Sequence, residues 1–159
     1  MLEQLLGLIA QSSAAQALKA SQFVYPLVNA LHILALATLF GSIAVLDLCI
    51  LAKARADFLA PLARVVPPIA GSGLALAAAT GLLLFSVQPF DYAANPAFLS
   101  KLVLVFAGAV HAMALHATAD FRRLLATGRT SLALAVSAGF SLLVWMAAIF
   151  AGRFIAFLA

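Results

Sequence analysis

Four apolar segments, each long enough to cross a bilayer, constrain this chain more than any other feature. A spanning helix needs about 20 mostly apolar residues. The segments that reach this length are residues 23–51, 67–87, 96–119 and 130–152. Of the 159 residues, 66% are hydrophobic and only 9% are charged, whereas roughly a quarter are charged in soluble domains. The sequence therefore predicts an all-α membrane protein, an up-down bundle of four transmembrane helices that forms a single integral membrane domain over residues 1–159.

The first 19 residues carry a different pattern, which is typical of a helix lying on the membrane surface. Large apolar side chains recur at the i, i+3, i+4, i+7 spacing of one helical face, at Leu2, Leu5, Leu6 and Ile9. An acid, Glu3, stands where a signal peptide has basic residues, and the apolar run that follows is short. We therefore expect a short amphipathic interfacial helix over about residues 2–19.

Proline and asparagine indicate where two of the spanning helices begin. Pro67 suits the first turn of the second helix. Asn95 and Pro96 suit the N-cap and the first position of the third helix. The stretches before and after that third helix, QPFDYAANP (88–96) and DFRRLLATGR (120–129), are predicted to be loops.

The distribution of basic residues predicts the orientation of the bundle. Six of them follow the first and third apolar segments, namely Lys53, Arg55, Arg64, Arg122, Arg123 and Arg129. The opposite side has only Lys19, Lys101 and Arg153. The positive-inside rule then places both basic loops in the cytoplasm and both termini outside. Because the basic residues lie beside apolar segments, we interpret the net charge of +4 as a topology signal and a contact with anionic lipid, with no nucleic-acid partner.

Small residues indicate how the helices pack. In the second segment they repeat every four residues, at Gly73, Ala77 and Gly81, a spacing that lets another helix backbone approach closely. The fourth segment repeats this spacing at Ser131, Ala135 and Gly139. Packing within the chain is the favoured interpretation, and a dimer face is the alternative.

Chemistry-bearing residues are few, and the sequence carries no phosphate-binding glycine loop, GxSxG, HExxH or CxxC motif. It therefore leaves open whether the protein is an enzyme. An ionisable residue at membrane depth is by default a functional hypothesis. The residues of this kind are His32, Asp47, Lys101, His111 and His116.

Two of the histidines are predicted to lie at similar depth. At 1.5 Å per residue, His32 lies roughly 12–17 Å and His111 roughly 20–22 Å below the outer ends of their helices. With ordinary helix tilt the two imidazoles reach a common layer, where they can ligate the iron of haem b. Lys101 can extend to a haem propionate at the outer interface. His116 lies about 7 Å deeper than His111 and falls outside that layer.

Two other interpretations stay open. Intramembrane histidines also serve as hydrogen-bond partners between helices, in which case the protein is a non-catalytic membrane subunit or anchor without a cofactor. Copper handling is the third interpretation, with imidazole and thioether ligands from His111, Met113, His116 and Met146. Asp47 lies near the basic loops, and we expect it to form a structural ion pair with Arg122 or Arg123. A proton relay through Asp47 is the less favoured alternative.

The combined pattern resembles a family of small four-helix bacterial inner-membrane proteins classed as a domain of unknown function. The matching residues are Tyr25-Pro26, His32, Gly41, Asp47-Leu48, TGLLLFS (Thr80 to Ser86), and YAANPAF followed by Lys101. More distantly, the chain is similar to copper-resistance-D-like and protoporphyrinogen-oxidase-type membrane proteins. That resemblance implies a haem- or porphyrin-associated bundle at His32, Lys101 and His111, acting in electron transfer or porphyrin handling. The expected partners of the protein are the lipid bilayer and a homo-oligomer or larger redox complex.

Overall fold

The computed structural model describes residues 1–158, which form α-helices and one 3-10 turn and contain no strand. The helices are α1 (Leu2–Ala10), α2 (Ser13–Ala20), α3 (Val24–Leu51), α4 (Ala56–Val87), α5 (Pro89–Ala94), α6 (Pro96–His116), α7 (Ala119–Thr127) and α8 (Leu132–Phe154), followed by the turn η1 (Ile155–Phe157). Four of them, α3, α4, α6 and α8, are long and apolar enough to cross a membrane. The predicted all-α fold with four spanning helices is confirmed.

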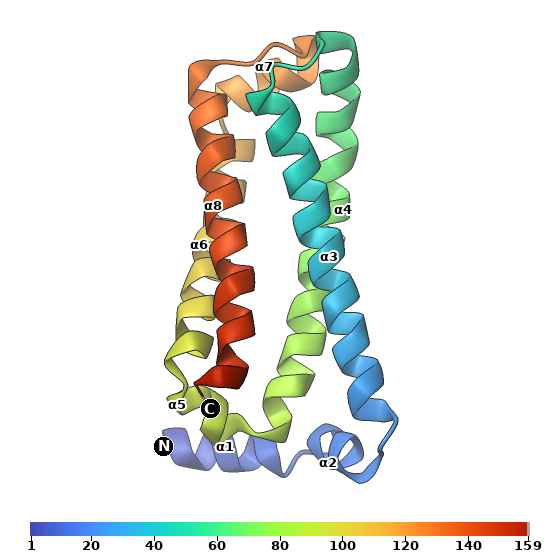
Figure 1. Ribbon diagram of the computed structural model, residues 1–159, viewed down its shortest axis with the longest axis vertical. Coiled ribbons are helices and arrows are strands. Elements are labelled where there is room, and N and C mark those ends of the chain that lie inside the picture. Colours follow the sequence, from blue (N-terminus) through green and yellow to red (C-terminus); the bar gives the residue numbers. More distant parts are fainter. Residues whose placement is uncertain (159) are drawn as a thin grey trace.

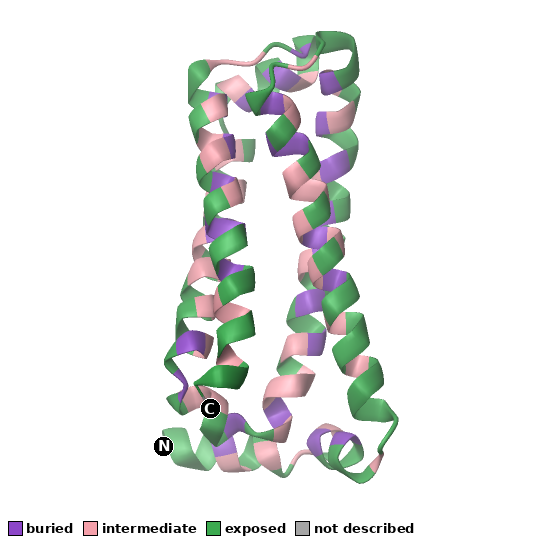
Figure 2. Cartoon of the chain, viewed as in Figure 1, coloured by how far each residue is buried: buried purple, intermediate pink, exposed green. Residues whose placement is uncertain are grey.

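The four long helices run up and down along the long axis of the molecule (Figure 1). The N-terminus, α1, α2 and α5 lie at one end with the end of α8, and α7 lies at the other end beside the link between α3 and α4. We call the second end the α7 end. Exposed residues cover the outer faces of the long helices (Figure 2), and many of them are large and apolar, such as Phe106 and Leu82. A surface of this kind suits a lipid bilayer.

The bundle consists of two helix pairs. Helix α3 packs along α4, α6 packs along α8, and contacts between α3 and α8 join the pairs. Gly73 makes the first pair close, because a Cβ atom at that position would lie 2.7 Å from the backbone nitrogen of Leu39 and 3.0 Å from the carbonyl oxygen of Ala35. Ala77, one turn further along α4, is buried as well. The small residues of α4 therefore pack within the chain.

The corresponding set on the fourth span does not form such an interface. A Cβ atom at Gly139 would meet nothing within 4 Å. Ser131 lies before the first turn of α8, where its hydroxyl accepts a hydrogen bond from the backbone N–H of Leu134 at 3.2 Å and caps the helix. Its hydroxyl thus stabilises the start of α8.

Helix α4 begins at Ala56 and not at residue 67, so the predicted start is wrong. Pro61, Pro67 and Pro68 all lie inside this 32-residue helix. Prolines are tolerated in spanning helices where neighbouring groups satisfy the freed carbonyls. The additional turns are held by burial, since Leu59 and Ala63 belong to the core at the α7 end. The predicted segment is therefore the C-terminal part of a longer helix.

The amphipathic N-terminal helix is present but divided into two. Helix α1 ends at Ala10, and Ser12 starts α2 by accepting a hydrogen bond from the Ala15 backbone N–H at 3.3 Å. Leu6 on α1 and Leu18 on α2 are buried against the bundle. The two helices lie across the end of the long helices, as expected for an interfacial element (Figure 1).

Both predicted loops contain a helix. Pro89 begins α5, and the Tyr92 ring packs there at a tilt against Phe85 and Phe98, with ring-centroid distances of 6.2 and 5.4 Å. Burial raises the pKa of the Tyr92 phenol above its usual value, and the nearby Tyr25 phenol adds to this effect. At the other loop, the hydroxyl of Thr118 caps the N-terminus of α7, whose apolar face fills the core.

Most of the large buried side chains gather at the α7 end. The main cluster joins α3, α4, α7 and α8 and consists of Leu46, Ile50, Leu59, Ala63, Val66, Phe121, Leu124, Leu134 and Ala138. A second, smaller cluster of Leu39, Ala70 and Trp145 joins α3, α4 and α8 nearer the middle. The Trp145 ring covers Gly108 of α6, where a Cβ atom would lie 2.9 Å from it. This Trp145 layer separates the two halves of the bundle.

Gly128→Ala is expected to lower the free energy of unfolding by about 2 kcal/mol or more, because a left-handed non-glycine residue alone costs roughly 1–2 kcal/mol. Gly128 ends α7 with a φ of +66°, and a Cβ atom there would also clash with the backbone of Ala56. Thermal unfolding in detergent measures the effect. Gly7→Ala is the control, since no atom lies within 4 Å of a Cβ at Gly7. Equal melting temperatures for the two variants would contradict this account.

Candidate functional site

His32 points from α3 toward α4, where its Nδ1 atom lies 2.9 Å from the Thr80 hydroxyl oxygen. That hydroxyl also lies 2.7 Å from the backbone carbonyl of Leu76, to which it donates its only proton. The Nδ1–H group of His32 must therefore donate to Thr80, and its Nε2 atom keeps a free lone pair. Gly81 makes this approach possible, since a Cβ atom there would lie 3.2 Å from the imidazole Cε1.

Lys101, in the second turn of α6, crosses over α8. Its Cδ, Cε and Nζ atoms pass 3.3–3.4 Å from the position of a Cβ atom at Gly152, so this glycine leaves room for the lysine side chain. Among residues 1–158 the ammonium group has no hydrogen bond or salt bridge. It lies close enough to His32 to interact with it electrostatically. The His32–Lys101 site, which comprises these two residues and Thr80, thus lies between the helix pairs.

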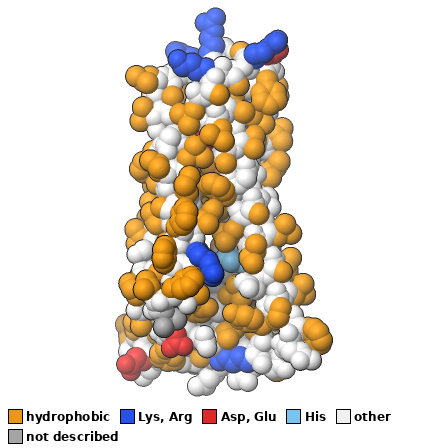
Figure 3. Space-filling view, viewed as in Figure 1, with side chains coloured by type: hydrophobic (Ala, Val, Ile, Leu, Met, Phe, Trp, Pro, Cys, Tyr) orange, Lys and Arg blue, Asp and Glu red, His pale blue; other side chains and the backbone are white. Residues whose placement is uncertain are grey.

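The outer surface agrees with this placement. Figure 3 shows a basic side chain next to a histidine on an otherwise apolar face of the bundle, in the half opposite the α7 end.

Asn95 sets the start of α6 and hence the position of Lys101, because its Oδ1 atom accepts hydrogen bonds from the backbone N–H groups of Ala97 and Phe98. Its Nδ2 atom donates to the carbonyl of Ile155 at 3.1 Å, which ties α6 to the end of α8. The predicted N-cap at Asn95 and helix start at Pro96 are confirmed.

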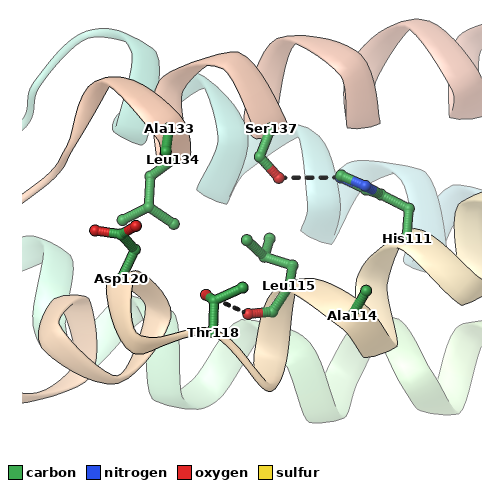
Figure 4. A pocket seen from close by; sticks show the side chains of 8 residues that line it. All are labelled: His111, Ala114, Leu115, Thr118, Asp120, Ala133, Leu134 and Ser137. Atoms are coloured by element: carbon green, nitrogen blue, oxygen red, sulfur yellow. Dashed lines mark hydrogen bonds between the residues drawn. The ribbon is translucent and has the colours of Figure 1, made fainter.

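His111 belongs to the other helix pair. Its Nε2 atom lies 3.0 Å from the Ser137 hydroxyl of α8, and its ring meets the edge of Phe140 at a centroid distance of 4.9 Å. Beside this pair lies a cavity of about 240 Å³ (Figure 4). Its lining residues are His111, Ala114, Leu115, Thr118, Asp120, Ala133, Leu134 and Ser137. We call it the α6–α8 cavity.

The structure does not bring together the two histidines that were expected to share an iron. His32 lies seven residues before Leu39, and His111 lies three residues after Gly108, on opposite sides of the Trp145 layer. At 1.5 Å per residue this is a separation of about 15 Å along the bundle axis, whereas metal–imidazole bonds are about 2 Å long. The pairing of His32 with His111 on one haem therefore does not fit.

The copper ligands are not assembled either. The Nδ1 atom of His116 lies 2.6 Å from the Ala112 carbonyl of its own helix, and its ring packs on Phe121. Met113 is 66% exposed on the lipid-facing surface. Over the described part of the chain, no three His, Cys, Asp or Glu side chains form a group that can hold a metal ion.

Asp47 does not form the expected ion pair with Arg122 or Arg123. Its side chain is 5% exposed and faces Ser141 of α8, and its Oδ2 atom has no hydrogen-bond partner. Arg122 is exposed and donates to the carbonyl of Ala117 at 2.7 Å. The only salt bridge within residues 1–158 joins Arg55 and Asp57 at the surface. The prediction failed because Asp47 lies on the face of α3 that packs inside the bundle.

Three hydroxyl residues of the candidate sites were not predicted, namely Thr80, Ser137 and Ser141. The sequence carried a signal for two of them, because Ser137 and Ser141 are four residues apart and so share one side of α8.

Comparisons of the chain with protein-family models, with curated proteins and with solved structures found no match. The family resemblance inferred from the sequence therefore stays a prediction.

Proposed function

We propose that the protein binds haem b at the His32–Lys101 site, where His32 would hold the iron, and acts in electron transfer or porphyrin handling. The observation that carries this proposal is the hydrogen bond from His32 Nδ1 to Thr80. A metal-ligating histidine usually donates its other ring N–H to a nearby acceptor, which orients the ring and leaves the ligating nitrogen unprotonated. His32 has this arrangement.

Lys101 supplies the second part of the argument. An ammonium group without a partner in apolar surroundings is costly, and within residues 1–158 Lys101 is such a group. A haem propionate would offset this cost through a charge-assisted hydrogen bond. Haem combines a flat apolar body with two carboxylates, so it suits a site between apolar helices that contains one cation and one free imidazole nitrogen. When bound, haem supplies one-electron transfer.

The alternative function is a non-catalytic membrane subunit or anchor without a cofactor. It is supported by the hydrogen bonds themselves, since His32 bonds to α4 and His111 bonds to α8. Both histidines are therefore also explained as links between neighbouring helices. A redox complex or a homo-oligomer is the partner expected for either function.

A haem titration of the purified protein distinguishes these functions. Haem is added in detergent while the visible spectrum is recorded in the oxidised and reduced states. We expect a Soret band shifted from that of free haem and an α band on reduction. No spectral change with the wild-type protein would overturn the haem proposal and favour the anchor.

Lys101→Met is expected to weaken haem binding by about tenfold, because a hydrogen bond to a charged group contributes roughly 1.5 kcal/mol or more. The Soret band should keep its position, since the iron ligand is unchanged. Lys19→Met is the matched control, because Lys19 lies on α2 and donates to the Ala10 carbonyl, away from the site. Equal haem affinities for the two variants would show that Lys101 does not bind a propionate.

We infer that the protein lies in a bacterial inner membrane with the α7 end in the cytoplasm. Basic side chains gather at this end (Figure 3). Five of the nine lysines and arginines lie in the two links there, and a sixth, Arg64 of α4, donates to the carbonyl of Leu125 in α7. Such an excess favours the cytoplasmic side. The His32–Lys101 site would then lie in the outer half of the bilayer.

A further inference from the structure

The α6–α8 cavity brings polar groups from the α7 end into the bundle. Thr118 and Asp120 line it where α6 joins α7, and His111 and Ser137 line its other end (Figure 4). A cavity needs only about 10–15 Å³ of this kind of volume to hold one water molecule if polar partners are present. The 240 Å³ cavity is therefore large enough for several waters between Asp120 and His111.

The inner end of the cavity can pass a proton onward. His111 Nε2 and the Ser137 hydroxyl are 3.0 Å apart. A neutral imidazole takes up a proton on one nitrogen and releases one from the other, and a hydroxyl both donates and accepts. Ser141 follows Ser137 by one helical turn, about 5.4 Å along α8.

Asp47 lies at the end of this polar series. Its carboxyl group is buried beside Ser141, with an unpartnered Oδ2 atom. Its neighbours on α3, Leu46 and Ile50, belong to the apolar cluster at the α7 end, against which two titratable side chains pack, Cys49 and, through Phe121, His116. A carboxylate in such surroundings has no counter-ion, so a bound proton removes the cost of its charge.

We propose that the α6–α8 cavity is a proton-access route from the aqueous phase at the α7 end to the carboxyl group of Asp47. The proton passes through the cavity water, the pair of His111 and Ser137, a water molecule that bridges the one-turn gap along α8, and then Ser141. It leaves a water or buffer molecule and becomes the O–H proton of Asp47, and no electron moves. This route lies on the other side of the Trp145 layer from the His32–Lys101 site and does not depend on haem.

Hydrogen–deuterium exchange at Asp47 tests the route. The carboxylic acid C=O band is recorded by infrared spectroscopy, assigned as the band lost in Asp47→Asn, and followed after transfer to D₂O. We expect Ser141→Ala to slow its deuterium shift by about tenfold or more. Ser72→Ala is the matched control, because this exposed serine of α4 bonds only to its own helix. An unchanged rate in Ser141→Ala, or the absence of a band specific to Asp47 at any pH, would overturn the proposal.

A second experiment tests whether protons enter through the cavity. Ala133 lines the cavity, and the neighbouring Leu132 is 81% exposed and does not. Each is changed to cysteine in a Cys49→Ala background and labelled with a bulky thiol reagent. Labelling Ala133→Cys is expected to slow deuteration of Asp47 by about tenfold, whereas labelled Leu132→Cys should exchange at the unlabelled rate. Exchange in labelled Ala133→Cys at the unlabelled rate would show that the proton arrives by another path.

Discussion

Gly73→Leu is expected to separate α3 from α4 and to lower the free energy of unfolding by about 3 kcal/mol or more, at the upper end of the usual cost of overpacking. The reason is that a side chain at Gly73 meets backbone atoms. A Cβ atom alone would lie 2.7 Å from the Leu39 nitrogen, and a rotation of side chains cannot relieve this contact. The remaining atoms of leucine would have to fit between two helix backbones.

The matched control for this prediction lies two residues away on the same helix. Gly71→Leu introduces the same side chain into α4, but no atom lies within 4 Å of a Cβ there. Unfolding in a denaturing detergent, followed by circular dichroism, compares both variants with the wild-type protein. A Gly73→Leu variant as stable as Gly71→Leu would mean that α3 and α4 do not approach as closely as described.

His32→Ala is expected to abolish the shifted Soret and α bands, which is the largest functional effect that we predict. The variant removes the only free imidazole nitrogen beside Lys101, and the iron loses its protein ligand. His111→Ala should keep both bands, because His111 lies about 15 Å away along the bundle axis and bonds to Ser137. The measurement is the haem titration in both oxidation states.

His111→Ala is also the matched control for stability. Like His32→Ala, it removes one imidazole and one hydrogen bond between neighbouring helices. A general loss of folding would therefore affect both variants similarly. Loss of the bands in both would restore the paired ligation expected from the sequence, and retention in both would place the haem elsewhere.

The spanning helices were predictable because a bilayer demands about 20 apolar residues in a row. The start of α4 was not predictable, and the same length requirement explains why. Residues 67–87 span about 31 Å at 1.5 Å per residue, close to the thickness of the hydrocarbon core. An apolar window therefore finds where a helix crosses the membrane, whereas the first turns of α4 are stabilised by packing outside that window, at Leu59 and Ala63.

The candidate sites were predictable in part. His32 and Lys101 were identifiable because an ionisable residue in an apolar segment is costly. Their partners were not, because a serine or threonine in a spanning helix often bonds only to its own helix, as Thr38 does to the Leu34 carbonyl. Depths counted from predicted helix ends also gave His32 and His111 a common layer. The outer ends of α3 and α6 do not lie at the same height along the bundle axis. The difference in height is seen only from packed neighbours such as Leu39.

The two helix pairs have a consequence for the order in which the protein assembles. Each pair is consecutive in the chain, α3 with α4 and α6 with α8, so during synthesis the first hairpin is complete before the last span has been made. His32 bonds to Thr80 within the first hairpin and His111 to Ser137 within the second. Each histidine therefore has its hydrogen-bond partner as soon as its own hairpin has formed. The polar groups that come together only when both hairpins are present are Asp47 beside Ser141 and His32 near Lys101. They are therefore brought together last, when the two hairpins join.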